Sequence, residues 1–228
     1  LDGRKYITSA KDRSKDQSYV LWGLSQECLH RTRMPLGVFT KPEVRQMAAE
    51  RGWDDLSKKA ESYEICFVPD NDYRGFLRRR VDALDEKVAG GHLVEASGKV
   101  LGKHEGYPFY TVGQRKGLGI ALGEPMFVTE IRPETNTVVL GREEELIRNH
   151  MMVGKVNLMK YASLPGSGLD VVTKVRYRDN GTFSTLHAVG NDVEVVFHAN
   201  VKGIAPGQSA VFYEGDDVVG GGIIQGGF

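Results

Sequence analysis

The stretch DVVTKVRYRDNGTFSTLHAV, residues 170–189, contains the pattern that decides the fold of the second half of the chain. Two runs that alternate apolar and polar residues flank Asp179-Asn180-Gly181, a composition typical of a turn between two hairpin strands. Beyond about residue 150, short alternating runs of this kind recur at intervals of roughly ten residues. Regularly spaced short strands with turn signals predict a small β-barrel over residues 149–228.

The residues before this region alternate between helical and glycine-rich patterns. Residues 18–30 and residues 72–85 carry apolar side chains at helical spacing. Between them, Thr40 precedes the start of an apolar stripe at Lys41, and Gly52 follows its end. These residues predict a helix with Thr40 as its N-cap and Gly52 at its C-terminal cap.

Changes in the residue pattern along the chain predict three parts. Short β-like runs punctuated by glycine follow the helical region and continue to about residue 146. We therefore predict an α+β multidomain protein with parts at 1–70, 71–148 and 149–228. The middle part is expected to be a small β-rich domain.

The composition excludes several classes of protein. Thirty basic residues balance thirty acidic ones, so a polyanion site would have to be a local patch. No apolar run approaches the roughly 18 residues of a membrane helix, so no membrane partner is expected. Two cysteines form no disulfide framework, which favours a cytoplasmic compartment. The six histidines lack metal-binding spacing, so no metal site is predicted.

The pattern leaves the role of Cys66 open. This cysteine lies in the apolar run Ile65-Cys66-Phe67-Val68, where packing as a small hydrophobic side chain is the commoner role. A nucleophilic thiolate would need a nearby cation or helix N-terminus. Lysines upstream and a helix beginning near Asp72 could supply one. Cys28 lies on the apolar face predicted for residues 18–30, so we expect it to pack in the core.

Two basic segments suit contact with phosphate. Lys174, Arg176 and Arg178 alternate along a predicted strand, so they would share one face, with Tyr177 beside them. Aligned cations and an aromatic ring suit an RNA backbone and a stacked base, although an exposed barrel face is the alternative. Residues 103–120 combine glycines with Arg115 and Lys116, which suits either a phosphate contact or a tight turn.

Five segments in order also match one pattern: KDQSYVLWGL at 15–24, SYEICFVPDNDYRGFL at 62–77, HEGYPFYTVGQRKGLGI at 104–120, RYR at 176–178, and PGQSAVFYEGDDVVGGGII at 206–224. Together they resemble the tRNA-specific 2-thiouridylases, the MnmA or TrmU family. The resemblance covers nearly the whole chain, and the segment at 104–120 is its most specific part.

The resemblance implies ATP-dependent transfer of sulfur, with Mg²⁺, to C2 of the wobble uridine of certain tRNAs. Cys66 would carry the sulfur as a persulfide, which would reverse the expectation drawn from its apolar surroundings. The partners would be tRNA and a persulfide-donor protein, either a cysteine desulfurase or a sulfur carrier. The family's tRNA contacts fall on Lys15, Asp16, Gln17, Arg176, Tyr177 and Gln208.

The chain also departs from the family pattern. The SGGxDS loop that holds the ATP pyrophosphate, the second catalytic cysteine and the acidic base have no match in it. We therefore expect residues 1–70 to be the C-terminal part of an α/β PP-loop domain. We further expect the chain to be a fragment that neither binds ATP productively nor thiolates tRNA alone.

Two further expectations follow from the residues themselves. A regular strand would point Arg176 and Tyr177 in opposite directions, so a bulge or a strand end is expected there. If Cys66 is inert and buried, the alternative function is a non-catalytic RNA-binding β-barrel module. A thiol-redox protein is a weaker alternative, because no resolving cysteine lies close in sequence.

Overall fold

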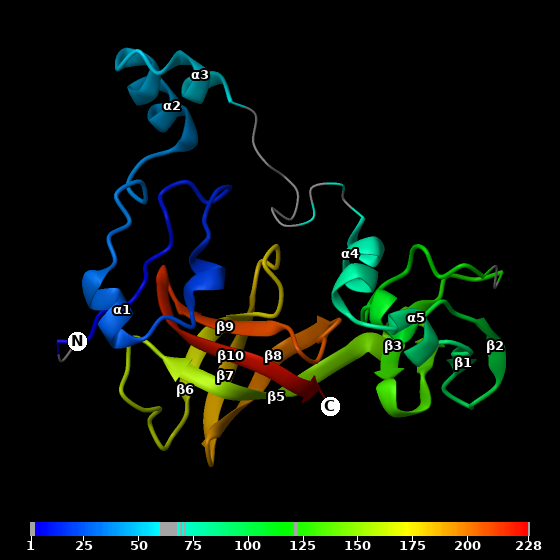
Figure 1. The fold of residues 1–228 in the computed structure, drawn as a ribbon. Helices are drawn as coiled ribbons and strands as arrows, with labels where there is room; N and C mark the ends of the chain where they lie inside the picture. The colour runs from blue at the N-terminus through cyan, green and yellow to red at the C-terminus, as the bar shows by residue number, and fades with distance from the viewer. Residues whose placement is uncertain (1–2, 60–67, 69, 71, 121–122, 228) are drawn as a thin grey trace. The chain divides into compact units, whose positions relative to one another are not determined.

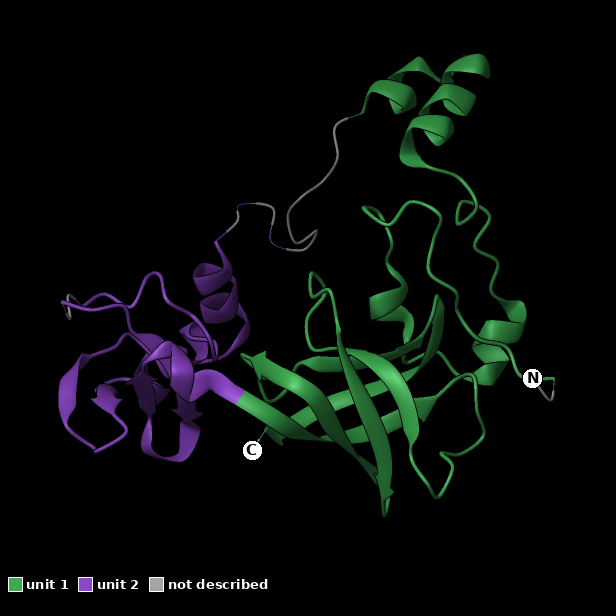
Figure 2. Cartoon of the chain, turned by 180° about the vertical axis from the view of Figure 1, so that it is seen from behind, with its two compact units in different colours: residues 1–60, 148–228 green, residues 61–147 purple. Residues whose placement is uncertain are grey.

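The computed structural model describes residues 3–59, 68, 70, 72–120 and 123–227. Contacts group the chain into two compact units (Figure 2). Unit 1 comprises residues 1–60 and 148–228, and unit 2 comprises residues 61–147. The three-part division with boundaries at 70 and 148 stays a prediction. The two units are defined by contacts alone, and this definition places the first residues and the barrel in one unit.

The second half of the chain forms the predicted barrel. Its six strands close in the order β10-β5-β8-β7-β6-β9 (Figure 1). Alternation along β6, β7 and most of β8 buries one face of each strand, whereas β9 and β10 are buried on both faces. Leu186, Val195 and Phe212 are fully buried inside the barrel. The strands are β5 (Ile147–Leu158), β6 (Leu169–Lys174), β7 (Thr182–Val189), β8 (Asp192–Lys202), β9 (Ser209–Glu214) and β10 (Asp217–Gly227).

The hairpin between β6 and β7 is confirmed, with a longer connection than a two-residue turn. The two strands pair as far as Thr173 and Thr182. The Asp179 carboxylate accepts hydrogen bonds from the backbone N–H groups of Val175 and Gly181, both at 3.0 Å. Gly181 has a φ of +87°, and this conformation favours glycine.

The end of β6 at Lys174 corrects one prediction and confirms another. Arg176, Tyr177 and Arg178 follow the strand in a turn, so a single cationic strand face through Lys174, Arg176 and Arg178 is wrong. The expected strand end at Arg176 and Tyr177 is confirmed. The turn frees both side chains from strict alternation, so they need not point to opposite faces.

The helix predicted over residues 18–30 is interrupted. A 3₁₀ helix η1 (Ser18–Leu21) precedes the short helix α1 (Gln26–Arg31), and Gly23 lies between them. Ser25 is the N-cap of α1, since its hydroxyl accepts from the N–H of Cys28 at 3.2 Å. Cys28 is exposed and the next residue, Leu29, is buried, so the prediction that Cys28 packs in the core is wrong.

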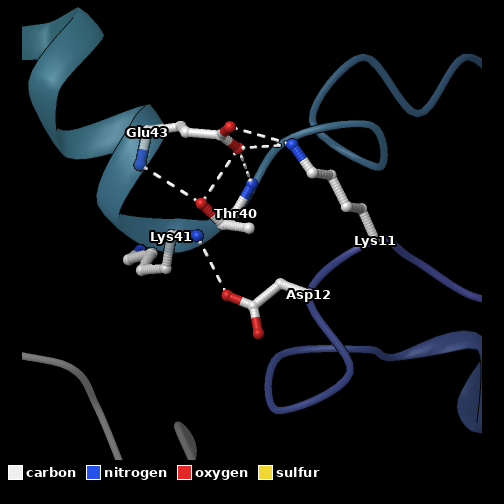
Figure 3. Close-up of polar contacts among 5 residues, drawn as sticks. All are labelled: Lys11, Asp12, Thr40, Lys41 and Glu43. Atoms are coloured by element: carbon white, nitrogen blue, oxygen red, sulfur yellow. Dashed lines mark hydrogen bonds and ion pairs between the residues drawn. The ribbon is translucent and has the colours of Figure 1, made fainter.

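Helix α2 (Lys41–Glu50) begins and ends as predicted. Thr40 and Glu43 form a capping box, and Gly52 follows the helix with a φ of +75°. Figure 3 shows the Glu43 carboxylate between Thr40 and Lys11, whose ammonium group donates to it at 2.8 Å. The hydrogen bond from Lys11 lowers the pKa of Glu43 to about 2, so this carboxylate stays ionised except at strongly acid pH. Helix α3 (Asp54–Lys58) packs against α2.

The N-terminal segment packs on the outside of the barrel at β9 and β10 (Figure 1). Tyr19 and Leu29 share an apolar cluster with Met159, Val211 and Val218. The N–H of Val218 donates to the carbonyl of Ile7 at 2.8 Å, and Thr8 and Asp217 form an isolated β-bridge. These contacts explain why the first residues and the barrel form one compact unit.

A buried ammonium group stabilises the β9–β10 turn. Lys160 is 8% exposed and hydrogen-bonds the carboxylates of Glu214 and Asp217, with 2.7 Å to Asp217. Burial opposes the charge on Lys160, but these two carboxylates outweigh that effect and raise its pKa. Lys160 is therefore charged at physiological pH and joins both ends of the β9–β10 turn.

Unit 2 is a four-stranded sheet with short helices, as the glycine-rich pattern predicted. The helix predicted over 72–85 is split, because Val81 is extended and Ala83 has a φ of 53°. The sheet order is β2-β1-β4-β3, and β1 and β4 are parallel. The elements are α4 (Tyr73–Arg80), α5 (Leu84–Lys87), β1 (His92–Glu95), β2 (Val100–Lys103), η2 (Tyr107–Phe109), β3 (Phe127–Arg132), η3 (Pro133–Thr135), β4 (Thr137–Gly141) and η4 (Glu143–Leu146).

A buried histidine connects two turns of unit 2. His104 accepts from the N–H of Gly106 at Nδ1 and reaches the carbonyl of Asn136 with Nε2 at 3.1 Å, so Nε2 carries the proton. This pattern fits the neutral ring, and burial lowers the pKa of His104 below its usual 6.5. Protonation would add an unsolvated charge and remove the acceptor used by Gly106.

Acidification is expected to destabilise unit 2 through His104. Because the folded-state pKa lies below the unfolded one, the stabilising contribution is complete above about pH 6.5 and is lost as the pH falls below that value. Urea unfolding at pH 7.5 and 5.5 would measure it, with His104→Gln as the comparison. We expect wild type to lose more stability than the variant over this interval. An equal loss in both proteins would contradict the assignment.

No helix among the described residues is long and apolar enough to cross a membrane. The same residues contain no group of three or more His, Cys, Asp or Glu side chains that could hold a metal ion.

Candidate functional site

The structure describes the predicted tRNA contacts but not the predicted nucleophile. Cys66 lies outside the described residues, so its role stays a prediction. The six other predicted residues all lie in unit 1 and are described: Lys15, Asp16, Gln17, Arg176, Tyr177 and Gln208.

The Asp16 carboxylate is used inside its own loop. One oxygen accepts from the N–H of Ala10 at 2.9 Å and of Ser18 at 3.2 Å. The other accepts from the Ser18 hydroxyl at 2.6 Å. These bonds fix a tight loop that leaves Lys15 and Gln17 exposed on either side. The Asp16 carboxylate therefore orders the loop, and the roles of Lys15, Asp16 and Gln17 in binding RNA stay predictions.

Tyr177 joins the 15–17 loop to the β6–β7 connection. Its hydroxyl donates to the backbone carbonyl of Asp16 at 2.9 Å, across 161 positions of sequence. Its ring meets that of Tyr19 edge to face, with centroids 6.1 Å apart. Tyr177 remains 46% exposed, so one part of the ring is fixed and another is open to a stacking partner.

The segment containing Gln208 reaches the same place through Tyr19. The Tyr19 hydroxyl donates to the carbonyl of Ser209 at 2.7 Å, and the indole N–H of Trp22 donates to the Ser209 hydroxyl at 3.0 Å. Gln208 precedes Ser209 and is exposed. Three segments that are far apart in sequence are thus connected by hydrogen bonds around Tyr19.

Arg176 is held by the loop that follows β8. Its guanidinium donates to the carbonyl of Gly203 at 2.9 Å. Gly203 has a φ of +70°, and a Cβ atom built there would lie 2.3 Å from the guanidinium. The glycine therefore allows the close approach of Arg176, whose guanidinium is held by the carbonyl of Gly203.

Buried phenols support this arrangement. Burial raises the pKa of Tyr19 to about 12, and burial also raises the pKa of Tyr213. Both hydroxyls are therefore protonated donors at neutral pH. Because the Ser18 hydroxyl gives its proton to Asp16, Tyr213 donates to Ser18 across the 3.1 Å contact between their oxygens.

Sequence reasoning missed Ser18, Tyr19 and Tyr213 as supports of the site. Tyr19 was interpreted as a helical position, and Tyr213 as part of an alternating strand. The one signal available was the position of Ser18 and Tyr19 directly after Lys15-Asp16-Gln17. The Asp16 carboxylate accepts from the N–H of Ser18 at the start of η1.

Comparison with known proteins gives matches along the whole chain. Family models match residues 2–70 (tRNA methyl transferase HUP domain), 76–142 (tRNA methyl transferase PRC-barrel domain) and 148–224 (Aminomethyltransferase beta-barrel domain). The chain is 60% identical over 227 residues to the tRNA-specific 2-thiouridylase MnmA of Amoebophilus asiaticus, covering all of this chain and 60% of that protein.

Two further relatives carry the same description. The protein of Cytophaga hutchinsonii is 60% identical over 227 residues, which make up 62% of its length. The protein of Salinibacter ruber is 50% identical over 223 residues, covering 97% of this chain and 58% of the relative. The chain thus spans about three fifths of the length of these curated relatives.

Proposed function

Because the chain belongs to the MnmA family of tRNA-specific 2-thiouridylases, we propose that it provides the tRNA-binding and sulfur-carrying parts of a tRNA-uridine 2-sulfurtransferase. In this proposal the enzyme is ATP-dependent: adenylation of the C2 oxygen of the wobble uridine lets that oxygen leave with AMP when the outer sulfur of a persulfide on Cys66 attacks C2. The second catalytic cysteine of the full-length enzyme would then attack Cys66 and form a disulfide with it, which breaks the S–S bond and leaves the outer sulfur on C2 as 2-thiouridine. A cysteine desulfurase or a sulfur-carrier protein would load Cys66.

The observation that supports tRNA binding is the convergence around Tyr19. Lys15 offers a cation, Gln17 and Gln208 offer amides, and Tyr177 offers an open ring face, all on one compact unit. Single-stranded RNA is recognised by this combination, because splayed bases stack on aromatic rings and hydrogen-bond through their edges. An anticodon loop provides such bases.

Residues 3–59 do not show the succession of elements that a PP-loop ATP site needs. Within residues 3–59, the structure has η1, three short helices and one β-bridge at Thr8. A PP-loop site needs a strand, a glycine loop and a helix N-terminus in succession to cradle phosphates, and that described range holds no such sequence of elements. ATP binding therefore has no assigned residue in this part of the chain.

Replacing Tyr177 with alanine is expected to weaken binding of an anticodon stem-loop RNA by about fivefold to 150-fold. The estimate corresponds to about 1–3 kcal/mol for one lost base–aromatic stack. Fluorescence anisotropy at fixed salt, with this 228-residue chain and a stem-loop carrying uridine at the wobble position, would measure it.

Two variants separate stacking from general effects. Phe183→Ala removes another exposed barrel aromatic, 68% exposed, and is expected to leave the affinity unchanged. Tyr177→Phe keeps the ring but loses the bond to the Asp16 carbonyl, so an intermediate affinity is expected. Wild-type affinity in Tyr177→Ala, or equal losses in Tyr177→Ala and Phe183→Ala, would argue against this interface.

A further inference from the structure

The glycine-rich loop of unit 2 has a built conformation that the proposed function does not use. Its base is fixed to β3, since the N–H of Gly113 donates to the carbonyl of Val128 at 2.7 Å and the N–H of Val128 donates to that of Gln114 at 2.9 Å. The Gln114 amide clamps the loop from inside, accepting from the N–H of Thr111 and donating to the carbonyl of Lys116 at 2.9 Å. The following Leu118 is buried.

The sign of φ alternates along the backbone of this loop. Gly117 and Gly119 have φ values of +73° and +75°, whereas Lys116 and Leu118 are not among the residues with positive φ. A Cβ atom at Gly119 would meet nothing within 4 Å, so glycine is needed there for its conformation and not for space. Alternation of this kind turns successive N–H groups toward one side and forms a concavity that binds anions.

The donors of this concavity are not used elsewhere in the described part of the chain. From Arg115 to Gly119, no backbone N–H group has an acceptor among the described residues. Arg115 and Lys116 are both exposed, and neither forms an ion pair with a described residue. Two cations and a run of open donors therefore lie within five consecutive residues.

One acidic side chain borders the loop and has to be weighed. The loop lines an open hollow of about 480 Å³ together with Glu124, and apolar side chains such as Ile120 and Met126 form part of its wall. The Glu124 carboxylate pairs with Arg142 at 3.2 Å, which offsets its negative charge. Arg115 and Lys116 are the charged residues of the loop itself.

We propose that residues 115–119 form a phosphate-binding loop, in which backbone N–H groups bind the phosphate oxygens and Arg115 and Lys116 supply the positive charge. The phosphate could belong to an RNA backbone or to a free nucleotide, and both offer the same oxygens. Two adjacent exposed cations in a loop favour an RNA backbone as the source of the phosphate. Only the choice of RNA over a free nucleotide rests on the proposed function.

Amide chemical shifts of the ¹⁵N-labelled 228-residue chain would test the loop directly. Inorganic phosphate, AMP and the anticodon stem-loop RNA are titrated separately, and the amides of Gly117 and Gly119 are followed. We expect RNA to shift both amides at the lowest concentration and inorganic phosphate to shift them weakly. If AMP shifts them at a lower concentration than RNA does, the source is a nucleotide and the assignment to RNA is wrong.

A pair of double variants isolates the two cations. Arg115→Gln with Lys116→Gln is expected to lower RNA affinity about tenfold and to reduce the salt dependence by about one unit of slope for each cation. Lys87→Gln with Lys103→Gln removes the same charge from exposed positions of unit 2 and is expected to change affinity less than twofold.

The outcomes separate this proposal from the tRNA interface. Unshifted amides with all three ligands, or equal losses in the two double variants, would overturn the phosphate-binding loop. If Tyr177→Ala weakens RNA binding and the Arg115/Lys116 variant does not, the loop fails and the interface around Tyr19 stands. If RNA does not bind but phosphate or AMP shifts Gly117 and Gly119, the interface fails and the loop stands.

Discussion

Replacing Cys66 with serine is expected to abolish the gain of one sulfur atom that we predict for this chain on incubation with a cysteine desulfurase and cysteine. A persulfide forms when a thiolate attacks the outer sulfur of the donor persulfide and the donor leaves as a thiol. A serine hydroxyl at neutral pH cannot perform this exchange, because its alkoxide is inaccessible there. Intact-protein mass before and after a reductant would measure the gain and its reversal.

Cys28→Ser is the matched control for this experiment. Cys28 is the other cysteine of the chain and is exposed in α1, so it is open to nonspecific loading. We expect Cys28→Ser to keep the gain that Cys66→Ser loses. The reverse pattern would transfer the sulfur-carrying role to Cys28. If the wild-type chain and Cys28→Ser both bind the stem-loop RNA but gain no sulfur, the result would favour a non-catalytic RNA-binding module.

Local periodicity predicted the barrel well because several of its strands have only one face buried. In β7 and β8 the buried positions alternate, so the two-residue period was visible without any knowledge of strand partners. The capping residues of α2 were equally local, since Thr40 and Glu43 lie three positions apart. The same method failed over residues 18–30, where the hydroxyl of Ser25 starts a new helix that an apolar stripe does not reveal.

The geometry of the candidate interface could not be predicted from such local patterns. Its connections join Asp16 to Tyr177 and Tyr19 to Ser209, across 161 and 190 positions. Family resemblance supplied the predicted contacts but not their support. It placed Asp16 among the contacts with RNA, and it did not indicate the three hydrogen bonds that the Asp16 carboxylate accepts from Ala10 and Ser18.

Replacing Gly220 with alanine is expected to destabilise the barrel by about 1–3 kcal/mol, the usual cost of forcing extra atoms into a packed interior. Gly220 lies in β10 opposite Leu158 of β5. A Cβ atom there would lie 2.3 Å from the carbonyl oxygen of Asn157 and 3.0 Å from the Cα of Leu158. Both are backbone atoms of a paired strand, so no flexible side chain can move away to relieve the overlap.

Gly226→Ala tests whether the effect comes from this close approach. Gly226 lies in the same strand, but a Cβ atom would meet nothing within 4 Å and its φ is not positive. We expect a change within about 0.5 kcal/mol, as for most substitutions away from packed sites. Urea unfolding of both variants would give the free energies of unfolding. Equal losses would mean that glycine matters in β10 for reasons other than space.

The loss in Gly220→Ala should also reach the candidate interface. The Asn157 side chain donates to the carbonyls of Trp22 at 2.6 Å and Leu24 at 3.0 Å, so it connects β5 to the N-terminal segment. A displaced Asn157 backbone would loosen that segment and with it the link from Trp22 to Ser209. We therefore expect Gly220→Ala to weaken stem-loop RNA binding even where the barrel remains folded, whereas Gly226→Ala should bind like wild type. Unchanged RNA affinity in folded Gly220→Ala would show that the N-terminal segment keeps its place without Asn157.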